Sequence, residues 1–103
     1  MSLPGWWWDW IESLKLQARD RLGAQRADKL LALLTSWSGV EDELGRPPTI
    51  AEYESQTHLH HARVVDYLSL FAETFPNYAS PSELNHELAR AAEGGIPTLF
   101  IDH

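Results

Sequence analysis

Apolar residues recur at three- and four-residue intervals through most of the chain, which is the spacing of amphipathic helices. The first such stripe predicts a helix from about residue 4 or 5 to residue 22, with Gly23 as its stop. A second stripe predicts a helix that ends at Gly45; if this helix is interrupted, the break is expected at Ser38-Gly39. The two stripes consist of Trp7, Ile11, Leu14, Ala18 and Leu22, and of Ala27, Leu30, Leu31, Leu34, Trp37 and Leu44.

Three further helices are predicted from their start and stop signals. Pro47-Pro48 cannot lie inside a helix, and Thr49 followed by Glu52 forms a capping-box pattern, so a short helix is expected from about 49 to 58. A fourth helix is expected from about 60 to 74, ended by Pro76-Asn77, and a fifth from about 80 to 93, ended by Gly94-Gly95.

The C-terminal residues 96–101 have the composition of a strand, but no second convincing strand is available to pair with them. We therefore expect a short extended arm that packs on the domain or pairs with a second copy. The whole chain, 1–103, is long enough for one domain with a single core, and the predicted fold class is all-α.

The amino-acid composition excludes several classes of protein. The chain has no cysteine, which excludes disulfides and thiolate chemistry and fits a cytoplasmic protein, and no stretch predicts membrane insertion or secretion. The formal net charge of −7 argues against binding nucleic acid by bulk attraction. Basic residues are nevertheless concentrated between Lys15 and Lys29, where five of them face two acidic residues.

The segment Gly45-Arg46-Pro47-Pro48-Thr49-Ile50-Ala51-Glu52-Tyr53, followed by Leu59 and by Arg63-Val64-Val65-Asp66-Tyr67-Leu68, resembles a known pattern. It is similar to sigma-factor region 3 and to small helix-turn-helix regulators carried by bacterial chromosomes and mobile elements. The resemblance covers about residues 27 to 76 and implies a trihelical helix-turn-helix core there. To this core the chain adds the Trp-rich N-terminal helix, the fifth helix and the C-terminal arm.

The resemblance implies a recognition helix that opens near His60. Buried positions would be Ile50, Tyr53, Leu59, Val64 and Tyr67, and outward positions His60, His61, Ala62, Val65, Asp66 and Ser69. Two residues depart from the family pattern: His58 occupies the turn position where glycine is usual, and Glu54 occupies a packed position where a small alanine is usual. Histidine tolerates the left-handed conformation better than β-branched residues do.

The leading interpretation is a DNA-binding regulator of transcription or replication that contacts double-stranded DNA. The predicted base or phosphate contacts are His60, His61, Arg63, Ser69, Arg46 and Thr49, with further phosphate contacts from Lys15, Arg19, Arg26 and Lys29. Asp66 would repel the DNA backbone unless it accepts from a cytosine amino group. The alternative is an acidic adaptor that uses the same fold to bind a protein, such as a component of the transcription machinery or a phage or host factor.

Other kinds of site are weakly indicated. The histidines of the segment 57–68 have poor spacing for a metal, because His60 and His61 point about 100° apart on a helix. The sequence has no nucleophile elbow, no phosphate-binding glycine loop and no HExxH helix, so we expect neither an enzyme nor a cofactor.

Four tryptophans in Trp6-Trp7-Trp8-Asp9-Trp10 cannot all be covered by one small core. Trp7 lies on the predicted buried stripe. One interpretation is a wide apolar face folded over the domain; the other is a self-association surface made by Trp6, Trp8 and Trp10, which predicts a homodimer. An interfacial membrane helix is the least favoured interpretation. The acidic and basic residues of the predicted first helix leave no net positive charge that would attract anionic lipid.

Overall fold

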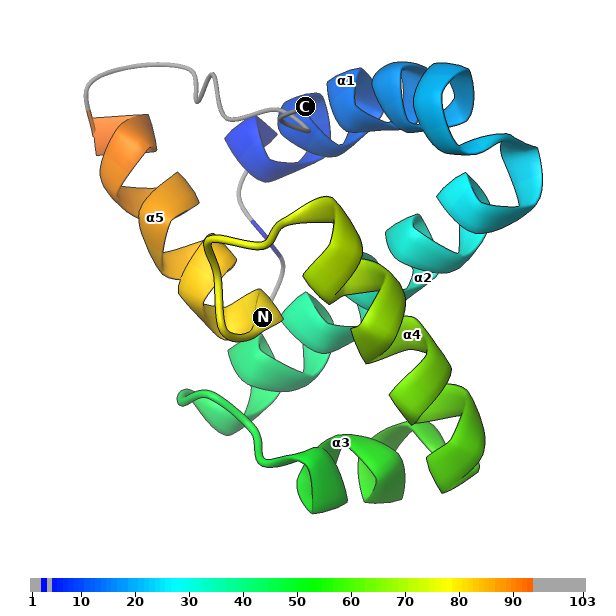
Figure 1. The fold of residues 1–103 in the computed structure, drawn as a ribbon. Helices are drawn as coiled ribbons and strands as arrows, with labels where there is room; N and C mark the ends of the chain where they lie inside the picture. The colour runs from blue at the N-terminus through cyan, green and yellow to red at the C-terminus, as the bar shows by residue number, and fades with distance from the viewer. Residues whose placement is uncertain (1–2, 4, 94–103) are drawn as a thin grey trace.

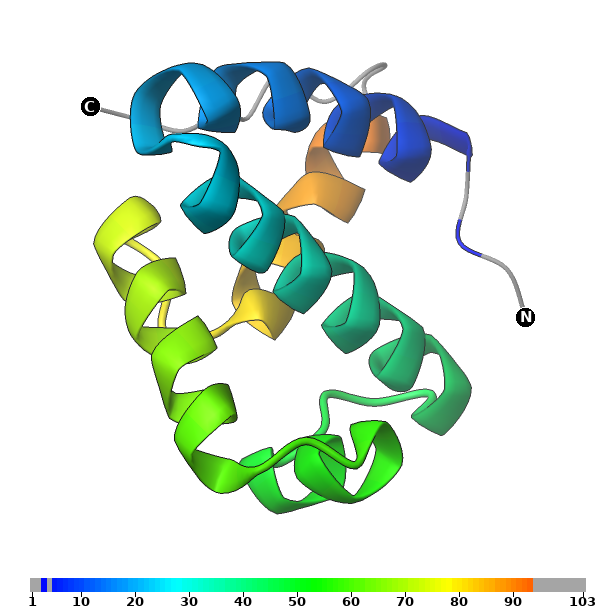
Figure 2. The ribbon, with the colours of Figure 1, turned by 90° about the vertical axis from the view of Figure 1, so that its right-hand side faces the viewer.

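The computed structural model describes residue 3 and residues 5–93, and within them the fold is all-α, as the periodicity predicts. Figures 1 and 2 show α2 running through the middle of the molecule, with the other helices arranged around it. Each of these four helices contacts α2, so the central helix supplies most of the core. The five helices are α1 (Gly5–Leu22), α2 (Ala24–Leu44), α3 (Ile50–Thr57), α4 (His61–Thr74) and α5 (Pro81–Glu93).

Helices α1 and α2 are joined by a single residue, Gly23. Its φ of 86° lies in the region that side chains disfavour, and its N–H donates to the carbonyl of Arg19 at 3.2 Å. The chain reverses there, and α1 folds back across the first half of α2 (Figure 2). The predicted start and stop of α1 are confirmed.

Helix α2 is continuous, so the interruption considered at Ser38-Gly39 does not occur. Ser38 is buried, and its hydroxyl exchanges hydrogen bonds with the Asn85 side chain of α5, with Asn85 Nδ2 to Ser38 Oγ at 3.0 Å. The same turn of α2 makes another hydrogen bond to α5: the indole Nε1 of Trp37 donates to Ser82 Oγ at 2.8 Å. Packing against α5 thus keeps α2 helical at Ser38-Gly39, where the helix propensity of the residues is low.

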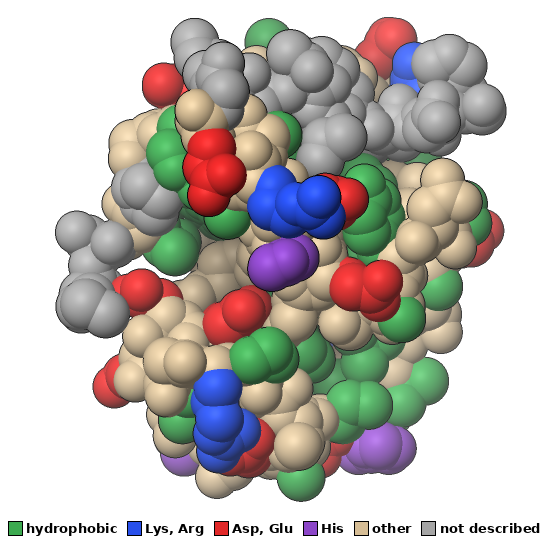
Figure 3. Space-filling view, turned by 90° about the vertical axis from the view of Figure 1, so that its left-hand side faces the viewer, with side chains coloured by type: hydrophobic (Ala, Val, Ile, Leu, Met, Phe, Trp, Pro, Cys, Tyr) green, Lys and Arg blue, Asp and Glu red, His purple; other side chains and the backbone are tan. Residues whose placement is uncertain are grey.

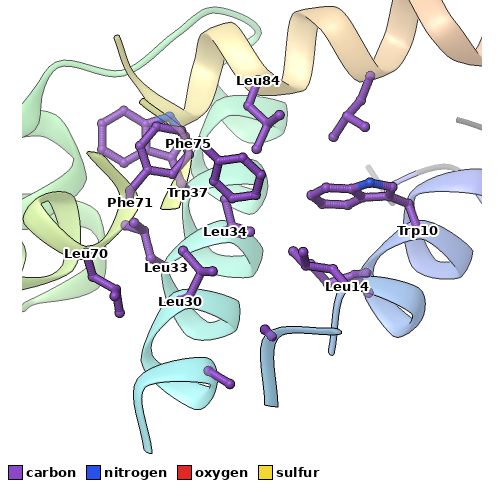
Figure 4. Packing of buried hydrophobic residues seen from close by; sticks show 14 of the residues in the cluster. Trp10, Leu14, Leu30, Leu33, Leu34, Trp37, Leu70, Phe71, Phe75 and Leu84 are labelled. Atoms are coloured by element: carbon purple, nitrogen blue, oxygen red, sulfur yellow. The ribbon is translucent and has the colours of Figure 1, made fainter. Parts of the chain in front are cut away.

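The core lies between α1, α2, α4 and α5, as Figure 4 shows. Trp10 and Leu14 project into it from α1 and meet residues of α2 and Leu84 of α5. Trp10 is only 1% exposed, which corrects its placement on a self-association surface. The indole of Trp10 is large and apolar, and it points from α1 toward α5 instead of lying at the edge of the buried side of α1.

A second part of the core joins α3 to α2. Tyr53 is fully buried and its ring lies 4.8 Å from that of Trp37, centroid to centroid. Its hydroxyl lies 2.6 Å from Ser36 Oγ, and burial raises the pKa of Tyr53. The short helix is therefore anchored by one aromatic side chain with a satisfied polar end. The predicted C-terminal arm, 96–101, lies outside the described residues.

Candidate functional site

The start of α3 is fixed by a complete capping box. Thr49 Oγ1 accepts from the backbone N–H of Glu52 at 3.1 Å, and Glu52 Oε1 accepts from the N–H of Thr49 at 2.9 Å. Arg46 donates from both terminal nitrogens to the same carboxylate, with Nη1 2.8 Å from Oε1. The Arg46 hydrogen bond, followed by the Thr49 N–H, lowers the pKa of Glu52 to about 2. Two predicted DNA contacts, Arg46 and Thr49, are thus already engaged with Glu52.

The turn between α3 and α4 is built on His58. This is the one non-glycine residue with positive φ among those described, at φ 58° and ψ 29°, and its N–H donates to the carbonyl of Glu54 at 2.9 Å. His60 returns to an extended conformation, and its carbonyl accepts from the N–H groups of Arg63 and Val64 as α4 begins. His58 thus ends α3 in the left-handed conformation that glycine most often adopts at this position of a helix.

The residues predicted to be buried in α3, in α4 and in the turn between them are buried or partly buried, with one exception. Tyr53 and Val64 are fully buried, and Leu59 and Tyr67 are partly buried against the core. Ile50 is 46% exposed, so its placement in the core is wrong. It is the first residue of α3, and a helix this short has room for one fully inserted side chain, which is Tyr53.

The outward side of α4 is exposed at every position predicted from the sequence. Its hydrophobic member, Val65, is 46% exposed, and the basic residue Arg63 forms no ion pair with any described residue. His61 Nδ1 lies 2.5 Å from Glu54 Oε2, a contact that gives Glu54 a role that an alanine cannot fill. The exposed set is His60, His61, Ala62, Arg63, Val65, Asp66 and Ser69.

The α2 part of the basic cluster lies against α4, and three residues of the cluster form ion pairs. Lys29 Nζ is 3.2 Å from Asp66 Oδ2, and Arg26 Nη2 is 2.9 Å from Glu73 Oε2. Arg19 lies 3.6 Å from Asp28, while Lys15 has no ion pair within the described part of the chain. These pairs could not be foreseen from the sequence, because they connect helices whose relative placement is set by the core.

With these contacts, three of the four carboxylates of α3 and α4 have a lysine or arginine partner. Glu52 pairs with Arg46, Asp66 with Lys29 and Glu73 with Arg26, while Glu54 lies beside the ring of His61. The side chains are largely exposed, so the pairs contribute little to stability. Their effect is on the electrostatic field near α4, because Glu52, Asp66 and Glu73 are locally neutralised, while Arg63 has no ion pair with a described residue.

The tryptophans of α1 divide between core and surface. Trp7 and Trp10 are buried, Trp6 is partly buried, and Trp8 is 47% exposed with its ring packed edge-on against Trp7 at 5.0 Å. Leu16 on the same helix is 75% exposed. Of the three residues predicted for self-association, Trp8 is therefore the one that presents a large apolar area to solvent.

Two further properties bear on function. Among residues 3 and 5–93, no three histidine or acidic side chains gather closely enough to hold a metal ion. No helix in the same part of the chain has the length and apolar content needed to cross a membrane.

The comparisons with known proteins add no constraint on function: the chain matches no family model, no curated protein and no solved structure.

Proposed function

We propose that the chain is a helix-turn-helix DNA-binding protein, in which α2, α3 and α4 form the trihelical unit and α4 is the recognition helix. One observation carries the proposal. A short capped helix, a left-handed turn at His58 and a longer helix follow one another, and the longer helix keeps its outward side exposed. That is the layout with which helix-turn-helix proteins enter the major groove.

The chemistry of the exposed side suits base edges better than phosphates. His60, His61 and Ser69 offer hydrogen-bonding groups, Arg63 can reach a guanine edge, and Val65 can touch a thymine methyl group. The pairing of Asp66 with Lys29 removes most of the repulsion that a free carboxylate would exert on DNA. Few cations remain for the backbone, so the affinity is expected to be modest and its salt dependence shallow.

A homodimer would compensate for the small number of contacts on each recognition helix. Two copies of α4 would meet two half-sites, and the exposed Trp8 of α1 is the natural center of such a contact. Tryptophan is one of the residue types enriched among interface hot spots.

Selection from random double-stranded sequences at low salt tests the proposal. We expect enrichment of a short motif by the wild-type protein, loss of that enrichment in Arg63→Ala and no change in Arg90→Ala. Arg90 is an exposed arginine of α5 that pairs with Glu87 at 3.6 Å, and so it is a matched control for the loss of a positive charge. Failure of the wild type to enrich any sequence would reject DNA reading by this protein.

A second candidate, an adaptor that binds a protein through the same surface, is favoured by one specific observation. Ile50 and Val65, the exposed large hydrophobic residues of α3 and α4, are each 46% exposed, while most of the neighbouring charges are paired. A partner held by apolar contact keeps its affinity as salt rises, whereas bound DNA is released. The adaptor proposal predicts that Val65→Ser weakens binding more than Arg63→Ala does.

A further inference from the structure

A cleft of about 770 Å³ lies between the N-terminal end of α1, the C-terminal half of α2 and α5. None of its lining residues belongs to α4, so it is separate from the candidate DNA-binding surface. Figure 3 views the side of the molecule that carries α5, where acidic, basic, histidine and hydrophobic side chains lie around a hollow. The volume falls within the range of clefts that bind small organic molecules.

One wall of the cleft is apolar and aromatic. It is formed by Leu3, Trp6 and Trp7, the last of which is 2% exposed. The indole Nε1 of Trp7 is buried without a hydrogen-bond partner, the one such side-chain atom among the described residues. This wall therefore combines the partly buried Trp6 with the buried Trp7, whose indole carries one unused hydrogen-bond donor.

The lining also carries charged side chains. Glu41 and Asp42 of α2 and Glu83 of α5 are acidic, Arg46 is held by Glu52, and His86 of α5 is the other lining residue that can be basic. Asn85 fixes the orientation of Glu41, because its Nδ2 donates to Glu41 Oε1 at 3.2 Å as well as to Ser38. Asp42 is half-buried and has no hydrogen-bond or ion-pair partner in the described part of the chain. The cleft thus combines indole surfaces with positioned and unpaired carboxylates.

We propose that this cleft binds a small organic cation: an amine with an aromatic or apolar body and an oxygen that can accept a hydrogen bond. Carboxylates attract the ammonium group, and tryptophan faces bind cations and apolar groups alike. The body of the ligand lies against Trp6 and Trp7, the ammonium group near Asp42 and Glu41, and the acceptor oxygen near the Trp7 indole.

Tyramine and its neutral analogue tyrosol test the charge requirement, because they differ only in an ammonium group against a hydroxyl group. The indole N–H signals of the tryptophans, recorded by two-dimensional NMR during titration, report where each compound binds. We expect tyramine to shift the Trp7 and Trp6 signals with a dissociation constant of about 1 mM or lower, and tyrosol to bind about fivefold more weakly.

Asp42→Asn should weaken tyramine binding about fivefold, while Asp20→Asn should leave it unchanged. Asp20 is an exposed residue of α1 outside the cleft, so this substitution removes the same charge elsewhere. Three results would overturn the proposal: no shift of these indole signals up to about 10 mM tyramine, equal binding of tyramine and tyrosol, or equal effects of the two substitutions. Because no residue of α4 lines the cleft, these results are independent of the DNA-binding proposal.

Discussion

Lys29 of α2 and Asp66 of α4 form an ion pair, with 3.2 Å between Nζ and Oδ2, across two helices that lie far apart in the sequence. The contact places a positive charge beside an acidic residue on the outward side of α4. The interpretation of α4 as a recognition helix depends on this arrangement, because an unpaired carboxylate at Asp66 would face the DNA phosphates.

Lys29→Ala should therefore weaken DNA binding, about two- to fivefold, because Asp66 is left without its partner. Asp66→Asn should strengthen binding by a similar factor, and the double variant should return close to the wild-type affinity. Fluorescence anisotropy with a labelled duplex measures all three. Weaker binding by Asp66→Asn would show instead that this carboxylate contacts the DNA.

The stability of both single variants should change by less than about 1 kcal/mol, because each side chain of the pair is more than half exposed. Urea unfolding separates this small effect from any loss of affinity. A larger destabilisation would mean that the pair holds α4 in place and that the binding change is indirect.

The capping box predicts a pH dependence at Glu52. Its pKa falls from an ordinary 4.5 to about 2 in the folded chain, chiefly through the Arg46 hydrogen bond. The ionised side chain therefore contributes stability in full above about pH 4.5, and this contribution is lost as the pH falls through about 2.

The free energy of unfolding of the wild type should exceed that of Glu52→Gln at pH 7, with a difference that shrinks between pH 4.5 and about 2. Urea unfolding followed by circular dichroism at several pH values measures it. A difference that is the same at pH 7 and at the acid limit would contradict the assigned role of the carboxylate.

The left-handed turn predicts a stabilising substitution. His58→Gly should raise the free energy of unfolding by about 0.5–1 kcal/mol, because glycine adopts a φ of 58° without the clash of a side chain. Gln56→Gly, two residues earlier and inside α3, should lower it by about 1 kcal/mol. If both substitutions destabilise the protein equally, the turn does not depend on the left-handed residue.

Much of this fold could be predicted from the sequence, because local signals determine where these helices begin and end. Gly23, the capping box at Thr49 and the turn at His58 each act within four residues, and the helix boundaries follow them closely. The errors concern Ser38-Gly39, where propensity suggests a break, and the placement of Trp10 and Ile50. The first two depend on contacts with helices distant in sequence, which a periodic pattern does not specify, and Ile50 is exposed because it opens a helix with room for one inserted side chain.

The candidate site was predictable to a similar extent. Exposure of the outward side of α4 follows from helical geometry, since buried Val64 and half-buried Tyr67 fix which side faces inward. The partners of the basic residues were not predictable. Arg26 and Lys29 are surplus charges in the sequence, and only the packing of α2 against α4 brings them to Glu73 and Asp66.

Self-association through α1 makes a prediction of its own. At concentrations on the order of tens of micromolar the wild type should sediment as a dimer, and Trp8→Ser should sediment as a monomer. Ile50→Ser is the matched control, because Ile50 is equally exposed on a different helix and its loss should leave the dimer intact. A monomeric mass for the wild type would contradict the dimer.

The most direct test of the central claim is the salt dependence of duplex binding by the wild type, Arg63→Ala and Arg90→Ala. We expect a shallow linear fall of log affinity with log salt, weaker binding of the selected duplex by Arg63→Ala at each salt concentration, and unchanged binding by Arg90→Ala. Duplex binding that is absent at low salt, or that is the same in the wild type and Arg63→Ala, would contradict the assignment of α4 as a DNA-recognition helix.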